Sequence, residues 1–347
     1  MNKLALLFSG AAVALVAPAA LLGACATDNG DSVHGPQFGP VPERSDGSAA
    51  DGPVSTDEGG ATNDAEAGSV EAGPDGAVPC ADGTVAVLAG NDSALSGAVQ
   101  IHGGAWTGSA ITGGAARSIP SLVAFGTGFT GLTRGANDAL QSVTYDATWS
   151  AATAVGSLVT LGSPALAVVG TKLQAVFLSG PDSGSADSHK FFRIESSGAG
   201  WSAADAVVAA SNPSFGPSAP SVAAAGTDLV MAQDGDNSKL YTQVWNATWA
   251  PAVQIADPLM TLKTAPPALV SATGKFDLVL LYADATAPHV IGFATRDATS
   301  KAWSNGQVTQ ATAQTAEQMS VAAISSTKLL VSFRGNDMRP YTMLGTI

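Results

Sequence analysis

Residues 80–347 are dominated by short runs in which apolar and polar residues alternate, with Gly, Asn and Asp between the runs. A period of two places one face of a strand on a core and the other in solvent, so each run predicts a β-strand. No stretch shows a long, capped pattern with a period of 3.6 residues. The pattern therefore predicts an all-β fold.

The runs recur in a fixed order, which reveals an internal repeat. A first strand opens each copy and is followed by a Gly- or Ser/Thr-rich turn, a second strand, a polar hairpin and a third strand. The first strands read "PSLVAF" from Pro120, "PALAVV" from Pro164, "PSVAAA" from Pro220, "PALVSA" from Pro267 and "MSVAAI" from Met319.

A tryptophan opens the fourth strand of most copies. The Pro-to-Trp separations are 29, 37, 29 and 36 residues, ending at Trp149, Trp201, Trp249 and Trp303. An N-terminal copy contributes second and third strands and Trp106 but no clear first strand. The last copy stops where its fourth strand would begin, which gives six copies in total.

A repeat of about 40 to 55 residues with four short strands is typical of a β-propeller. Residues 80–347 are therefore predicted to form six blades of four short strands, with the tryptophans filling the space between blades. A two-sheet sandwich is the alternative, but it does not explain the spacing. The closure of the ring is left open, with residues 77–84 as a weak candidate for an outer strand of the last blade.

Residues 1–24 read as an export signal, with Lys3 before an apolar run that ends in small residues. The sequence "LLGAC" (Leu21 to Cys25) resembles the bacterial lipobox. The resemblance implies that Cys25 becomes the lipid-modified N-terminus and that the membrane is a partner through this anchor. Because Ala26 rather than an aspartate follows, the usual bacterial sorting pattern favours the outer membrane. An ordinary signal peptide is the alternative.

Residues 25–79 have a different composition. Positions 26–79 hold 11 acidic residues and one basic residue, with 10 Gly, 6 Pro and one aromatic residue. Such a segment cannot bury enough apolar surface to offset the entropy of ordering, so it is predicted to be a disordered tether. The tether carries −10 of the net charge of −13, which argues against nucleic acid as a partner.

The hairpin sequence "RGANDALQSVTYDATW" (Arg134 to Trp149) and the shorter "RGNDMRPY" (Arg334 to Tyr341) are similar to the blade repeat of bacterial propeller lectins. Those proteins bind fucose and related sugars between blades. The resemblance implies a carbohydrate-binding or adhesion module, with Arg134, Asp138, Trp149, Arg334 and Asp337 as candidate ligand-binding residues. Ordinary turn charges and interblade packing are the alternative roles of these residues. Only two of the six copies keep the arginine, so the ligand is less well specified than the fold.

The sequence carries no complete catalytic or metal-binding motif. A weaker likeness to sialidase-like propellers fails at their Asp-box turn, because Asp146 precedes Trp149 by three residues rather than five. Residues 80–347 hold only two glutamates, Glu195 and Glu317, whereas most glycosidases need paired carboxylates. The histidines show no metal spacing, so no catalytic residue, metal or other cofactor is predicted. An envelope protein-interaction scaffold and a divergent sialidase-like hydrolase are the alternative functions.

Overall fold

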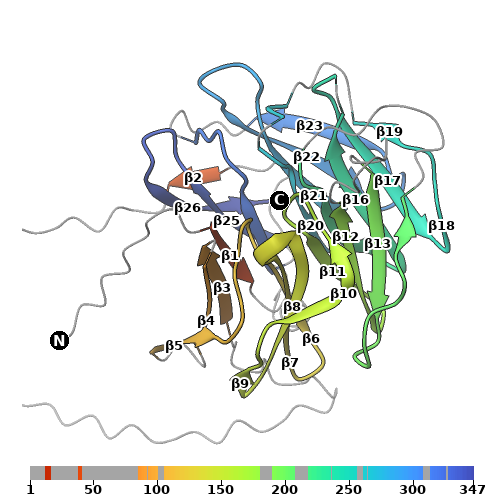
Figure 1. The fold of residues 1–347 in the computed structure, drawn as a ribbon. Helices are drawn as coiled ribbons and strands as arrows, with labels where there is room; N and C mark the ends of the chain where they lie inside the picture. Colours follow the sequence, from red (N-terminus) through yellow and green to blue (C-terminus); the bar gives the residue numbers. More distant parts are fainter. Residues whose placement is uncertain are drawn as a thin grey trace, which may run out of the picture.

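The alternating runs form antiparallel sheets in the computed structural model (Figure 1), which describes residues 12–16, 38–40, 85–91, 93–100, 105–179, 190–207, 218–235, 237–255, 261–263, 265–307, 313–325 and 327–347. Cys25 and Cys80, and all of the predicted tether except residues 38–40, lie outside the described residues. No helix among the described residues is long and apolar enough to cross a membrane.

The first three sheets follow chain order. Blade 1 contains β1 (Ala12–Val16), β3 (Val85–Asn91), β4 (Ala94–Gln100) and β5 (Trp106–Ile111). Blade 2 contains β6 (Ser121–Phe125), β7 (Gly128–Arg134), the 3-10 turn η1 (Ala136–Asp138), β8 (Ala139–Asp146), the short β9 (Thr148–Trp149) and β10 (Thr153–Val159). Blade 3 contains β11 (Ala165–Val169), β12 (Lys172–Leu178), β13 (Phe191–Ser196) and β14 (Asp205–Ala206).

The remaining three sheets complete the ring. Blade 4 contains β15 (Ser221–Ala225), β16 (Asp228–Asp234), β17 (Leu240–Asn246), β18 (Thr248–Trp249) and β19 (Val253–Gln254). Blade 5 contains β20 (Ala268–Ser271), β21 (Phe276–Ala283), β22 (Ile291–Asp297) and β23 (Trp303–Gln307). Blade 6 contains β24 (Ser320–Ser325), β25 (Lys328–Arg334), β26 (Pro340–Thr346) and β2 (Phe38–Pro40).

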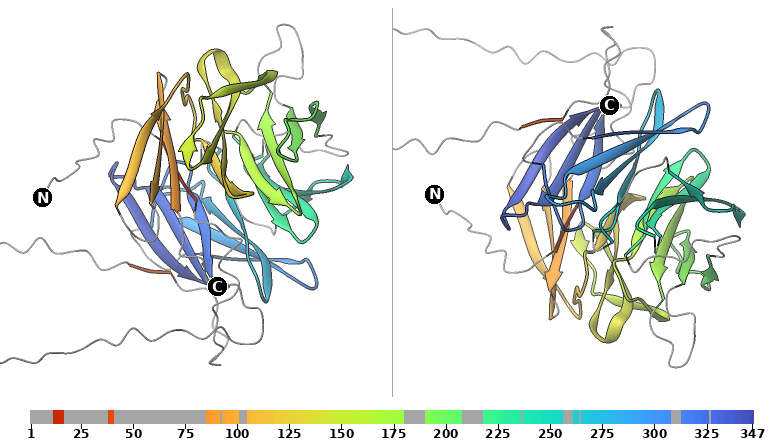
Figure 2. Two further views of the ribbon diagram at one scale, coloured as in Figure 1. Left: turned by 90° about the horizontal axis from the view of Figure 1, so that it is seen from below. Right: turned by 90° about the horizontal axis from the view of Figure 1, so that it is seen from above.

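The six sheets are arranged radially, so the fold is a six-bladed β-propeller. The innermost strands β6, β11, β15, β20 and β24 lie side by side around the axis, and β1 lies between β24 and β6. Both views in Figure 2 place blade 1 (orange) next to blade 6 (blue). The prediction of an all-β, six-bladed propeller is confirmed, and the sandwich alternative is wrong.

Local sequence explains the blade geometry. Pro120, Pro164, Pro220 and Pro267 each directly precede an innermost strand, where a residue without an N–H group costs no ladder hydrogen bond. In blades 2, 3 and 4 a two-residue loop then leads into the second strand. Its first residue is a glycine with a φ of 59–66°, as a tight hairpin turn requires.

The N-terminal part of the chain supplies the strands that the end copies lack. Strand β1 pairs with β3 as the innermost strand of blade 1, and β2 pairs with β26 as the outermost strand of blade 6. The fourth strand of blade 6 is therefore residues 38–40, whereas residues 77–84, the candidate from the sequence, lie outside the described residues. Both added strands lie in segments that the sequence assigns to the signal peptide and the tether.

The hydrophobic core is divided among the spaces between blades. Five clusters of buried side chains separate consecutive blades from blade 1 to blade 6. Trp149, Trp201, Trp249 and Trp303 are each partly buried against one of them. Trp106 differs, because 44% of its surface is exposed. The predicted packing role is thus confirmed for four of the five repeat tryptophans.

Candidate functional site

The arginine and aspartate predicted in blade 2 lie together at one end of the blade. Arg134 donates from Nε and Nη2 to Asp138 Oδ1, at 2.9 and 2.7 Å. Arg117 Nη1 donates to the same oxygen at 2.9 Å, and Arg134 Nη1 donates to the carbonyl of Leu161 at 2.5 Å. This cluster ties the η1 turn to the segment that leads into blade 3.

Trp149 does not lie with that pair. Arg134 pairs with Leu140 at the start of β8, whereas Trp149 pairs with Tyr145 at its far end. Strand rise separates these two points by on the order of 20 Å. The Trp149 ring packs on Tyr145, with ring centroids 5.2 Å apart, and faces blade 1. The three candidate ligand-binding residues of blade 2 therefore do not converge on one pocket.

The blade 6 candidates are also not paired with each other. Arg334 Nη1 bonds Glu317 Oε1 at 3.0 Å, and Arg334 Nη2 contacts the Met338 sulfur at 2.8 Å. Asp337 accepts hydrogen bonds from Tyr341 Oη at 2.6 Å and from the Arg339 N–H at 3.1 Å. The hydrogen bond from Tyr341 and that from the Arg339 backbone lower the pKa of Asp337.

A cavity of about 760 Å³ lies instead between blades 2 and 3, and we call it gap 2/3. This volume is within the range of ligand pockets in proteins. Its aromatic lining includes Trp201 of blade 3 and Phe125 of blade 2, whereas the Phe129 and Tyr145 rings pack in the cluster between blades 1 and 2. Its hydroxyl lining consists of Thr127, Thr130, Ser142, Thr144, Thr153, Ser157, Ser196 and Ser202.

Hydrogen bonds fix some of these hydroxyl groups and orient them along the wall. The Ser142 and Thr153 hydroxyls are 3.3 Å apart, which joins β8 to β10. Ser202 Oγ accepts from the Glu195 N–H and donates to the Ala203 carbonyl. Hydroxyl groups can both donate and accept, so a wall rich in them matches a ligand that itself carries several hydroxyl groups.

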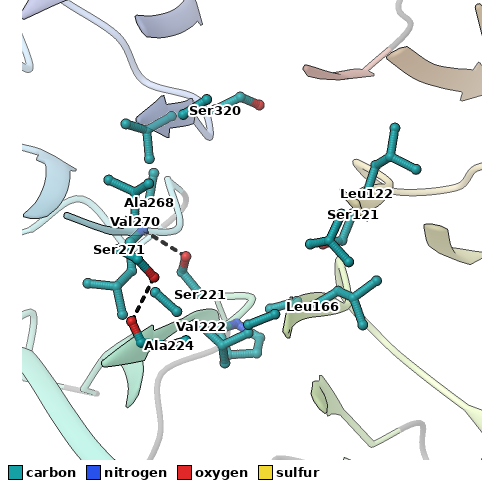
Figure 3. A pocket seen from close by; sticks show the side chains of 18 of the residues that line it. Ser121, Leu122, Leu166, Ser221, Val222, Ala224, Ala268, Val270, Ser271 and Ser320 are labelled. Atoms are coloured by element: carbon teal, nitrogen blue, oxygen red, sulfur yellow. Dashed lines mark hydrogen bonds between the residues drawn. The ribbon is translucent and has the colours of Figure 1, made fainter. Parts of the chain in front are cut away.

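A second cavity, of about 510 Å³, follows the propeller axis (Figure 3). The innermost strands of blades 2 to 6 line it with small apolar residues and serines, and none of the described lining residues is charged. Ser221 Oγ accepts from the Leu269 N–H at 2.8 Å, and Ser271 Oγ donates to the Ala224 carbonyl at 2.6 Å. These serines join blade 4 to blade 5, which gives them a structural role.

The described residues hold no group of three or more His, Cys, Asp or Glu side chains that could bind a metal ion. The two glutamates of residues 80–347 lie in different blades and both are ion-paired. Hydrogen bonds from Lys172 and then Arg193 lower the pKa of Glu195 to about 2, so this carboxyl is ionised at neutral pH. Glu317 pairs with Arg334.

The propeller is similar to solved structures of fucose-binding lectins. The fucose-specific lectin from Aleuria aurantia matches with a TM-score of 0.55 and 13% identity, over 76% of this chain and 88% of that one. AofleA from Arthrobotrys oligospora matches with a TM-score of 0.54 and 12% identity, over 75% of this chain and 79% of that one. A protein of unknown function from Dyadobacter fermentans matches with a TM-score of 0.53 and 12% identity, over 76% of this chain and 91% of that one. At these identities the likeness establishes the fold. No family model and no curated protein matches the sequence.

Sequence reasoning did not find gap 2/3, because its distinguishing residues are small serines and threonines. Comparison of equivalent positions in successive copies carries the signal that would have found them. The chain places Ser142 and Thr144 where the next blade has Arg193 and Glu195.

Proposed function

We propose that this protein is a lipid-anchored, carbohydrate-binding module of the bacterial cell envelope. The observation that carries the binding function is gap 2/3, where the Trp201 ring and a set of hydroxyl groups line one open cavity. An aromatic ring offers flat apolar area with little loss of entropy, and the hydroxyl groups match those of a sugar. The six-bladed lectins with a similar fold support this reading, and one of them has been solved in complex with α-methyl-L-fucoside.

The anchoring part of the proposal rests on sequence. The motif at Leu21 to Cys25 and the acidic segment after it support a lipid at Cys25 and a propeller held away from the membrane, most simply at the outer membrane. Gap 2/3 would then present its sugar site at the end of a flexible connection.

The binding function is tested with the chain carrying Cys25→Ala, purified whole. A glycan array that includes α-methyl-L-fucoside identifies the ligand, and calorimetry measures its affinity. We expect saturable binding that Trp201→Ala weakens at least tenfold. Trp106→Ala is the matched control, because Trp106 occupies the equivalent position in blade 1 but lies outside the gap. Absence of binding to every glycan, together with a stable protein partner in pull-down, would replace the proposal with the scaffold alternative.

A further inference from the structure

Strand registers identify equivalent positions in neighbouring blades. In blade 2, Thr130 pairs with Thr144 and Ser142 pairs with Thr153. In blade 3, Gln174 pairs with Glu195 and Arg193 pairs with Asp205. Thr130, Ser142, Thr144 and Thr153 thus correspond to Gln174, Arg193, Glu195 and Asp205. We call these four places the wall positions, because they face the next blade around the ring.

The wall positions of blade 3 fill the space between blades 3 and 4. Arg193 Nη1 bonds Gln174 Oε1, and it also bonds Glu195 Oε2 at 3.0 Å. Arg193 Nη2 bonds Asp205 Oδ2 at 3.0 Å. The guanidinium lies 3.9 Å from the centre of the Trp245 ring of blade 4, and only 4% of Arg193 is exposed. This network occupies the gap, although Arg193 Nε has no hydrogen-bond partner among the described residues.

In gap 2/3, neither blade fills the corresponding space with large side chains. The wall positions of blade 2 carry only threonine and serine, and all four of them line the cavity. On the opposite side of the gap, Ser196 of blade 3 is equivalent to Trp245 of blade 4. Ser196 pairs with Trp201, as Trp245 pairs with the repeat tryptophan of its own blade. Trp201 packs against the cluster between blades 2 and 3 and also borders the cavity.

In each of the other gaps, at least one of the corresponding places holds or faces a larger or apolar group. Between blades 1 and 2, the Trp149 ring covers Gly97, where an added Cβ would come within 2.1 Å of the ring. Between blades 4 and 5, Val244 and Trp303 both pack against the buried cluster, and between blades 5 and 6 the buried Phe293 takes the place of Ser142. Blade 6 presents Leu330 and Leu344 to blade 1 in place of two threonines, and these lack the polar groups that a sugar needs.

We infer that gap 2/3 is the single saccharide site of the described propeller, and that the wall positions decide whether a gap is open. This inference rests on the proposed function and deepens it. Asp146 is the one charged side chain among the described residues that line the cavity, so the site takes a neutral oligosaccharide and disfavours an anionic one. Binding is accordingly monovalent, with one ligand per chain.

The test exchanges the wall positions in both directions, in the whole chain carrying Cys25→Ala. The closing variant carries Thr130→Gln, Ser142→Arg, Thr144→Glu and Thr153→Asp. The opening variant carries Gln174→Thr, Arg193→Ser and Glu195→Thr. Thr144→Ser keeps both the hydroxyl group and the space, so it is the matched control. Calorimetry with α-methyl-L-fucoside, and with neutral and sialylated oligosaccharides from the array, gives affinity and stoichiometry.

We expect one ligand per wild-type chain, a loss of at least 100-fold in affinity in the closing variant, and a change within about threefold in the control. The opening variant should bind a second equivalent at the Trp245 face. Undiminished binding by a folded closing variant, or no second equivalent in a folded opening variant, would overturn the inference while leaving the sugar-binding function intact. If the wild-type chain binds no saccharide in any assay, the proposed function fails and the inference fails with it.

Discussion

At the scale of single residues, Asp234 is a carboxyl group buried without a full set of partners. It has no exposed surface, Ser218 Oγ donates to its Oδ2 at 2.8 Å, and its Oδ1 has no hydrogen-bond partner among the described residues. It ends β16 at the place where blades 2 and 6 carry Arg134 and Arg334. Burial raises the pKa of Asp234 to about 7, against the opposing effect of the Ser218 hydrogen bond. The charged form is therefore disfavoured in the folded protein.

This pKa makes the stability of the protein depend on pH. Between the unfolded pKa of about 4 and the folded pKa of about 7, the native state keeps a proton that the unfolded state has lost. Stability consequently falls as the pH rises through this window. We predict that Asp234→Asn, which cannot ionise, gains on the order of 2 kcal/mol over the wild type between pH 5 and pH 8.

Urea denaturation at pH 5, 6, 7 and 8 measures the difference in the free energy of unfolding between Asp234→Asn and the wild type. The exposed Asp146→Asn serves as the control and should give no comparable trend. Parallel pH profiles for Asp234→Asn and the wild type would show that the carboxyl does not titrate in this range.

At the scale of elements, the size of the side chains at a few equivalent strand positions decides whether the space between two blades is filled. Trp149 and Gly97 form one such contact between blades 1 and 2. An added Cβ at position 97 would lie 2.1–2.6 Å from three atoms of the Trp149 ring. Because the ring also packs on Tyr145, it cannot move without disturbing blade 2.

We predict that Gly97→Ala destabilises the protein by about 1–3 kcal/mol, the usual effect of overpacking a filled space. Gly108→Ala is the matched control, since its added Cβ would meet nothing nearer than 3.7 Å. Thermal melts should show a clear loss for Gly97→Ala and almost none for Gly108→Ala. Combining Gly97→Ala with Trp149→Leu should cost less than the sum of the two single changes, and strict additivity would show that the two residues do not touch.

The elements also show which features of the fold and of the site could be predicted from the sequence. The regular Pro-to-Trp spacing predicted the blades because packing between blades needs a bulky residue at a fixed strand position. Arg134 and Asp138, two of the candidate residues, form an ion pair that the sequence did not predict. The open gap escaped prediction because Ser142, Thr144 and Ser196 are ordinary strand residues. Their meaning depends on which residues face them across a blade boundary, and this is a property of tertiary packing.

At the scale of the whole molecule, the N-terminal segment supplies two strands to the propeller. Strands β1 and β2 add to the edges of blades 1 and 6. The five clusters between blades, as far as the described side chains define them, are formed by residues from Ala86 onward. Removal of residues 1–24 would leave blade 1 with three described strands, both in the lipidated chain and in a chain processed by ordinary signal peptidase.

The proposed lipid anchor can therefore be tested apart from folding. We predict that Cys25→Ala, carried on a leader that ordinary signal peptidase removes, moves the protein from the membrane fraction to the soluble fraction. Without acyl chains, the mature chain loses about 0.8 kcal/mol of membrane affinity for each CH₂ group that would have been buried. The melting temperature should stay within about 2 °C of that of the processed wild type, since both mature chains lack β1 and keep the same clusters. Fractionation in high salt and thermal melts of both proteins make the measurement. Retention of the variant in the membrane pellet would place the anchor elsewhere, whereas a soluble variant that melts far lower would show that the lipidated terminus helps to hold the ring together.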